Sequence, residues 1–178
     1  MVTGTPDIII PAIAKDGSLF PIEKMEAHRT DQQHLAISVF VFSGSKLLIQ
    51  QRAASKYHCP GKWANTCCSH PHWGETVEHA ASRRIGEELG IAVPLTKTSI
   101  FEYRADVGGG LVENERVHVF AGHADESVLS ISLDSEEVSA TKWVDVSELP
   151  ALLAETPDSL CPWFAIYIRH WDELQLGQ

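Results

Sequence analysis

The sequence has few basic side chains and no long apolar run. Fourteen lysines and arginines stand against twenty-four acidic residues, so the formal net charge is -10. Nucleic acids and anionic membranes require a basic face, so we expect neither as a partner. The longest apolar stretch, Leu35 to Phe42, is too short to span a bilayer, and the segment MVTGTPDIII lacks the basic start of a secretory signal. We therefore expect a cytoplasmic protein.

Cysteine is scarce, and its spacing excludes two common roles. The four cysteines are Cys59, Cys67, Cys68 and Cys161. They lack the spacing of a disulfide framework and form no zinc-binding CxxC pair. Cys67 and Cys68 are adjacent, and adjacent cysteines pair only with strain. We therefore expect free thiols.

Repeats, linkers and low-complexity segments are also absent, which favours a single domain over residues 1–178. A hydrophobic content of 44% is enough for a core. Predicted strands and helices interleave around one mixed sheet, which indicates an α/β domain (α+β in some schemes). We expect strands over residues 35–42, 46–52, 101–107, 111–124 and 139–146, and helices over 75–89, 148–155 (capped by Ser147) and 162–174. A hairpin is expected over residues 7–22, and the long loop over 53–73, rich in thiols and histidines, is expected to be functional.

The predicted helix over residues 75–89 directs one carboxylate toward the core. Its apolar positions recur every four residues, and Gly90 stands where a helix commonly ends. Glu88 falls close to that apolar stripe, whereas Glu87 points about a quarter-turn away. A buried charge needs a partner. We favour a metal ion at Glu88, with an internal arginine as the alternative.

Two further glutamates share one face of a predicted strand. Glu113 and Glu115 alternate in register with Val117 and Val119, so all four are expected to face inward. An exposed strand end is the alternative. If the pair is buried, then it requires a cation.

The segment SHPHWGETVEHAASRRIGEELGI resembles the Nudix box, with two departures. Ser69 stands where the box has its first glycine, and Arg84 stands where most Nudix hydrolases have a metal-holding glutamate. The preceding NTCCSHP is similar to the motif of the type 1, flavin-independent isopentenyl-diphosphate isomerases. This resemblance covers residues 24–163. It implies a Nudix-type α-β-α sandwich, with a core over about residues 31–165.

The resemblance also implies a set of site residues. One divalent metal, Mn, Zn or Fe, would be held by His28, His34, His70, Glu113 and Glu115. Magnesium would be held at Glu88 together with the substrate's diphosphate. The expected catalytic residues are Cys68 (rather than Cys67), Glu115, Tyr103 and Trp163. The expected diphosphate-binding cations are Lys24, Arg52 and Lys56, with Arg83 completing the cluster. Six further histidines have no counterpart in the motif and are expected on the surface or behind the ligands: His58, His72, His79, His118, His123 and His170.

The implied reaction interconverts isopentenyl and dimethylallyl diphosphate by proton addition and removal, through a tertiary carbocation and without flavin. A monomer is expected, with a dimer as the alternative. A Nudix pyrophosphohydrolase acting on nucleoside diphosphate derivatives, through Glu87 and Glu88, is the competing function. A non-catalytic metal-binding module, or a redox sensor built on Cys67 and Cys68, is a third.

Overall fold

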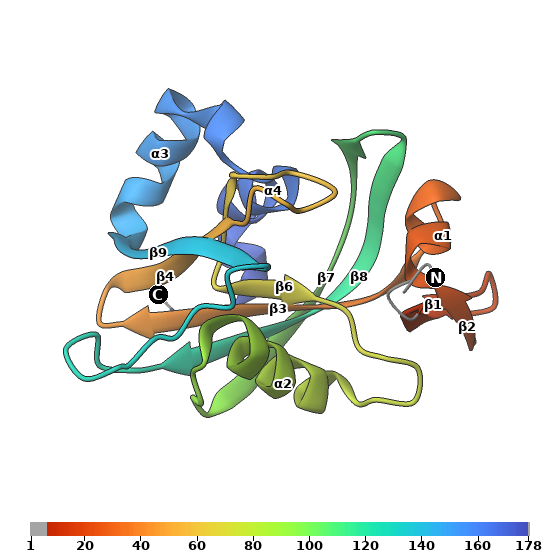
Figure 1. Cartoon of the computed structure of the whole chain (residues 1–178), viewed down its shortest axis with the longest axis horizontal. Helices are drawn as coiled ribbons and strands as arrows, with labels where there is room; N and C mark the ends of the chain where they lie inside the picture. Colours follow the sequence, from red (N-terminus) through yellow and green to blue (C-terminus); the bar gives the residue numbers. More distant parts are fainter. Residues whose placement is uncertain (1–6, 178) are drawn as a thin grey trace, which may run out of the picture.

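A computed structural model describes residues 7–177 of the chain. These residues form one mixed nine-stranded sheet with helices on both faces (Figure 1), which confirms the predicted α/β fold class. The strands are β1 (Ile9–Ile13), β2 (Leu19–Glu23), β3 (His34–Ser43), β4 (Lys46–Arg52), β5 (Trp63–Ala64), β6 (Cys67–Ser69), β7 (Leu95–Gly108), β8 (Leu111–His123) and β9 (Val138–Asp145). The α-helices are α1 (Lys24–Arg29), α2 (Val77–Leu89), α3 (Leu149–Glu155) and α4 (Pro162–Arg169).

Strand β3 lies at the centre of the sheet. It pairs in parallel with β8 and antiparallel with β1, β4 and β6. Successive side chains of a strand point to opposite faces, so Phe40 and Phe42 enter the core beneath α4, whereas Val39 and Val41 enter the core beneath α2. The near-continuous apolar run of this strand therefore reflects its coverage by helices on both faces.

Helix α2 covers one face of the sheet, as its apolar spacing predicted. It begins at Val77 rather than Glu75, because the Thr76 side chain accepts a hydrogen bond from the backbone N–H of His79 and caps the helix. It ends at Leu89. The following residue, Gly90, caps the helix: it has a φ of 65° and donates its N–H to the carbonyl oxygen of Gly86.

Several predicted element bounds are wrong. The chain forms helix α1 over residues 24–29, where no helix was predicted. Asp145, not Ser147, caps the turn before α3, because its carboxylate accepts the Ser147 N–H. The final helix stops at Arg169, and residues 171–174 form a separate 3-10 turn. The predicted strand over residues 101–107 extends back to Leu95.

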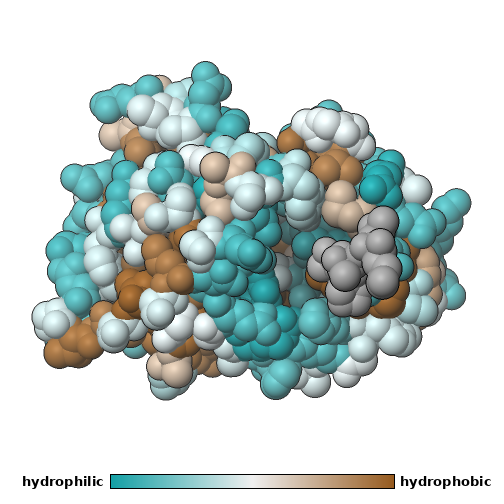
Figure 2. Space-filling model, in the orientation of Figure 1, coloured by the Kyte–Doolittle hydropathy of each residue, from teal (hydrophilic) through white to brown (hydrophobic). Residues whose placement is uncertain are grey.

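Within residues 7–177, no helix combines the length and apolarity that crossing a membrane requires. The face drawn in Figure 2 is hollowed near its middle, and mainly hydrophilic residues surround the hollow. A cavity lies where α1, β6, β8, α2 and the loop over residues 53–62 meet.

Candidate active site and metal centre

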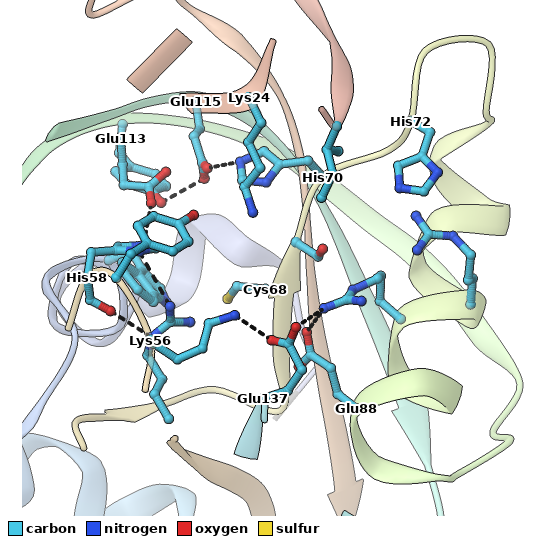
Figure 3. Close-up of a pocket in the computed structure, with 18 residues that line it drawn as sticks. Lys24, Lys56, His58, Cys68, His70, His72, Glu88, Glu113, Glu115 and Glu137 are labelled. Carbon is cyan, nitrogen blue, oxygen red and sulfur yellow. Dashed lines mark hydrogen bonds and ion pairs between the residues drawn. The ribbon is translucent and has the colours of Figure 1, made fainter. Parts of the chain in front are cut away.

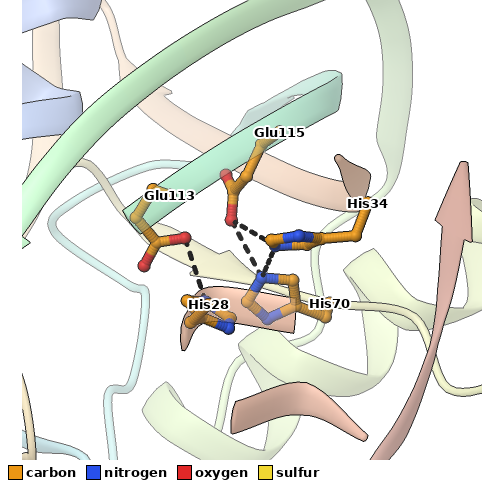
Figure 4. A group of neighbouring side chains, drawn as sticks. All are labelled: His28, His34, His70, Glu113 and Glu115. Carbon is orange, nitrogen blue, oxygen red and sulfur yellow. Dashed lines mark hydrogen bonds and ion pairs between the residues drawn. The ribbon is translucent and has the colours of Figure 1, made fainter. Parts of the chain in front are cut away.

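Three histidines and two glutamates from four parts of the chain converge at one end of the cavity. His28 comes from α1, His34 begins β3, His70 follows β6, and Glu113 and Glu115 lie on β8. Each offers one donor atom, and these atoms lie within 4.8 Å of one another (Figure 4). All five residues are buried. The parallel register of β3 and β8 pairs His34 with Glu115, which brings imidazole and carboxylate together.

Backbone carbonyls fix the orientation of two of these imidazole rings. The Nδ1–H of His28 donates to the Lys24 carbonyl oxygen at 2.6 Å, and the Nδ1–H of His34 donates to the Gln32 carbonyl oxygen at 2.8 Å. The Nε2 atoms therefore face the other donors, and His34 Nε2 lies 3.2 Å from His70 Nε2. Histidines that bind metals commonly donate their second N–H in this manner. The buried donor set fits a divalent metal with mixed nitrogen and oxygen ligands.

The carboxylates of this group are ionised in spite of their burial. Burial opposes the charge of Glu115, but hydrogen bonds from His34 and Tyr103 lower its pKa to about 2. Burial also opposes the charge of Glu113, and hydrogen bonds from His28 and His58 hold its pKa below the usual range. Two buried negative charges at this position require neighbouring protons or a cation.

Cys68 lines the cavity between this group and a second set of charged residues that includes Glu88 and Glu137 (Figure 3). Its thiol donates to Asn65 Oδ1 at 2.9 Å, and the Asn65 amide donates to Ser38 Oγ at 2.9 Å. Desolvation raises the pKa of this thiol to about 12. The thiol is therefore protonated at neutral pH and can donate a proton.

Tyr103 and Trp163 also line the cavity. The Tyr103 hydroxyl donates to Glu115 Oε2 at 2.7 Å, and burial raises the pKa of this phenol well above its usual value. The Trp163 ring is 3% exposed, and the Arg52 guanidinium lies 5.3 Å from its centre. A cavity lined by both an aromatic ring and an ionised carboxylate suits a reaction in which positive charge develops.

The predicted diphosphate-binding cations all line the cavity, but they differ in the ion pairs that they make with carboxylates of the protein. Lys24, Arg52 and Lys56 line it, and the Lys56 ammonium lies 2.7 Å from Glu137 Oε2. Arg83 lines it too, but its guanidinium donates to both oxygens of Glu75, at 2.7 and 2.8 Å. Arg83 is therefore less available to a ligand than the other three.

Glu88 is 4% exposed, which agrees with its predicted direction toward the core. Its partner in the structure is an internal arginine, the alternative to a metal ion. Arg84 Nη2 donates to Glu88 Oε1 at 2.5 Å, and Gln50 Nε2 donates to Oε2 at 2.9 Å. Arg84 also contacts Glu87. The arginine at the divergent position of the Nudix-like box thus pairs with both glutamates through which a hydrolase would bind its metals.

Several cavity residues were missed from the sequence, among them His58, Arg84 and Glu137. His58 was expected only as a surface group or a group behind the ligands, yet its Nε2 lies 2.9 Å from Glu113 Oε1, and burial lowers the pKa of its ring. Arg84 was read only as a departure from the box, yet it lines the cavity. A signal for His58 did exist, because it lies in the predicted loop over residues 53–73, which we singled out by its length and composition. That prediction was wrong in part, since strands β5 and β6 occupy the second half of the segment.

Comparison with known proteins agrees with this geometry. Residues 32–164 match the NUDIX domain family. The isopentenyl-diphosphate Delta-isomerase of Rhodobacter capsulatus is 50% identical over 162 residues, which cover 90% of this chain and 91% of the relative. The enzyme of the same name from Cereibacter sphaeroides (strain ATCC 17025) is 51% identical over 164 residues, which cover 92% of each chain.

Solved structures support the fold at lower identity. A Deinococcus radiodurans structure superposes with a TM-score of 0.73 at 17% identity, covering 91% of this chain and 98% of the other. A MutT NUDIX hydrolase from Burkholderia pseudomallei gives a TM-score of 0.59 at 22% identity, covering 78% and 97%. The family match and the close relatives lead to one assignment: the chain belongs to the NUDIX domain family and, within it, to the type 1 isopentenyl-diphosphate Delta-isomerases.

Proposed function

We propose that the chain interconverts isopentenyl diphosphate and dimethylallyl diphosphate, a step in the supply of isoprenoid precursors. The observation that carries this proposal is the convergence on one cavity of a protonated thiol (Cys68), an ionised carboxylate (Glu115) and three cations (Lys24, Arg52 and Lys56). The thiol and the carboxylate suit two proton transfers, and the cations suit a diphosphate.

In the proposed reaction, a proton is added to the terminal methylene of isopentenyl diphosphate, and another is removed from the neighbouring methylene. Cys68 and Glu115 carry these two transfers from opposite sides, and the Tyr103 hydroxyl holds the Glu115 carboxylate at 2.7 Å. The intermediate is a tertiary carbocation, so water must be excluded. The buried Trp163 ring serves this purpose and stabilises the positive charge.

A divalent metal bound by the three histidines, Glu113 and Glu115 would stabilise the ionised form of Glu115 and fix its position. Mixed nitrogen and oxygen donors suit Zn, Mn or Fe. We further propose that Glu88 holds magnesium together with the diphosphate, since carboxylate and phosphate oxygens suit that ion. The Glu88 oxygens accept hydrogen bonds from Arg84 and Gln50, so one of these hydrogen bonds must break when magnesium binds.

The competing function, pyrophosphohydrolysis, is not favoured. A hydrolase would need the Glu87 and Glu88 carboxylates for its metal ions, and Arg84 donates hydrogen bonds to both. The two functions are separated by incubating the pure protein with isopentenyl diphosphate and with a panel of nucleoside diphosphate derivatives. The proposal predicts dimethylallyl diphosphate and intact nucleotides. Phosphate or pyrophosphate release without any isomer would decide for hydrolysis.

A further inference from the structure

His58 lies in the loop between β4 and β5, and its side chain is enclosed by the cavity wall. It is 7% exposed, and its ring centre lies 4.3 Å from that of Tyr57 and 5.5 Å from that of Trp163. A buried imidazole has two polar nitrogens, and each requires a partner. The partners of His58 belong to opposite ends of the proposed site.

The partners determine which nitrogen of His58 carries the proton. Arg52 can only donate, and it approaches His58 from one side, with Nη2 3.5 Å from His58 Nδ1 and Nε donating to the His58 carbonyl oxygen at 3.2 Å. Nδ1 therefore accepts. The proton is on Nε2, which lies 2.9 Å from Glu113 Oε1. The Nε2 atom of His58 thus contacts Glu113, while the Nδ1 atom accepts from Arg52.

This contact engages the oxygen of Glu113 that does not face His28. Glu113 Oε2 lies 3.1 Å from His28 Nε2, so the contact of Oε1 with His58 fixes the rotation of the carboxylate and directs Oε2 toward the donor group. Arg52, on the other side of His58, is one of the cations expected to bind diphosphate. A single side chain therefore joins the two ends of the cavity.

We propose that His58 is a positioning residue, which orients Glu113 for the metal and steadies Arg52 for the diphosphate. This inference rests on the proposed function, because it requires a metal at the histidine and glutamate group. Partners that hold metal ligands in place typically change metal affinity or activity about 10–100-fold when they are removed. A residue that serves only packing would not change metal affinity.

The test compares His58→Leu, which fills similar space without a donor, with His58→Gln, whose amide N–H can still reach Glu113. Manganese(II) alone is titrated into each folded protein, without substrate, in competition with a chromophoric chelator. KM and kcat for isopentenyl diphosphate are then measured. His118→Ala is the control, because His118 lies on the opposite side of β8 from Glu113.

His58→Leu is expected to weaken manganese binding about 10–100-fold and to raise KM. His58→Gln is expected to recover most of the manganese affinity, and His118→Ala to keep it. The proposal is overturned if the Leu variant binds manganese within about two-fold of the wild type, or if the Gln variant is as weak as the Leu variant. A wild-type protein that neither binds manganese nor forms the isomer would instead refute the proposed function.

Discussion

Cys67 and Cys68 are neighbours in the sequence, yet their side chains lie on opposite faces of β6. Cys67 is fully buried in the core beneath α2, whereas Cys68 lines the cavity. Strand geometry produces this separation, because successive side chains alternate. The two thiols therefore offer a matched pair of substitutions with different expected effects.

Cys68→Ala is expected to abolish isomer formation, with a loss of about 10²–10⁴-fold, because it removes a proton-transfer group. Cys67→Ala is expected to keep turnover and to lose about 1–2 kcal/mol of stability through a small cavity. Initial rates and thermal unfolding of both variants check this. If Cys68→Ala retains full activity, or if Cys67 and Cys68 form a disulfide reversibly, then the results favour a redox sensor instead.

The strands, and the direction of their side chains, could be predicted from the sequence because they depend on the alternation of polar and apolar residues along the chain. Glu113 and Glu115 alternate with apolar residues, and the structure buries both, at 3% and 6% exposure. The hairpin around Asp16 and Gly17 likewise follows from turn residues between short strands. The tertiary contacts of these residues could not be predicted from the local sequence pattern. The pairing of Glu113 with His58 joins positions 55 residues apart, and only the folded sheet brings them together.

Helix bounds were harder to predict for a related reason. The apolar spacing of the last segment continues through Trp171, but the structure breaks the helix at His170, whose φ of -116° lies outside the helical range. Helix α1 lacks an apolar stripe. It forms because Glu23 accepts the N–H groups of Met25 and Glu26, and because His28 packs into the buried group of histidines and glutamates. Tertiary contacts decided both cases.

Tyr103→Phe removes the hydroxyl that donates to Glu115 Oε2 and leaves the ring in place. We expect kcat to fall about 10–100-fold, because the carboxylate loses a hydrogen bond that holds its position. Stability should change little, and KM should stay close to that of the wild type, since Tyr103 is not among the cations expected to bind diphosphate. A variant with an unchanged kcat would contradict the role given to this hydroxyl.

Gly90→Ala is expected to lower the free energy of unfolding by about 1–3 kcal/mol. Gly90 has a φ of 65°, and an added Cβ would lie 2.9 Å from both the Cβ and the carbonyl oxygen of Ser132. Gly86, on the same helix, is the control: its added Cβ would approach only the Ile91 carbonyl oxygen, at 3.9 Å. Gly86→Ala should raise stability by about 0.5–1 kcal/mol. Chemical denaturation of both variants measures the difference, and equal effects would refute the explanation.

Glu75 should make the protein sensitive to acid. Hydrogen bonds from Arg83, and from the backbone of His72, lower the pKa of Glu75 from 4.5 to about 2. Because the pKa is lower in the folded state, the stabilisation is fully present above about pH 4.5 and is lost as the pH falls toward 2.

Comparison with Glu75→Gln isolates this contribution from that of the buried histidines, which both proteins share. The wild type should have the larger free energy of unfolding near pH 7, and the difference between the two proteins should vanish as the pH falls toward 2. Glu78→Gln, at an exposed position in the first turn of α2, should show a smaller difference in stability. Unfolding curves at several pH values measure it. A difference independent of pH would contradict the assigned Glu75–Arg83 interaction.

The most direct test of the central claim follows the proton itself. Isopentenyl diphosphate is incubated with the purified, metal-loaded protein in deuterium oxide, and the product is examined by proton and phosphorus NMR. Two proton-transfer groups on either side of one double bond predict dimethylallyl diphosphate with solvent deuterium in its newly formed methyl group and an intact diphosphate. A product without deuterium, or release of phosphate or pyrophosphate in place of the isomer, would contradict the account.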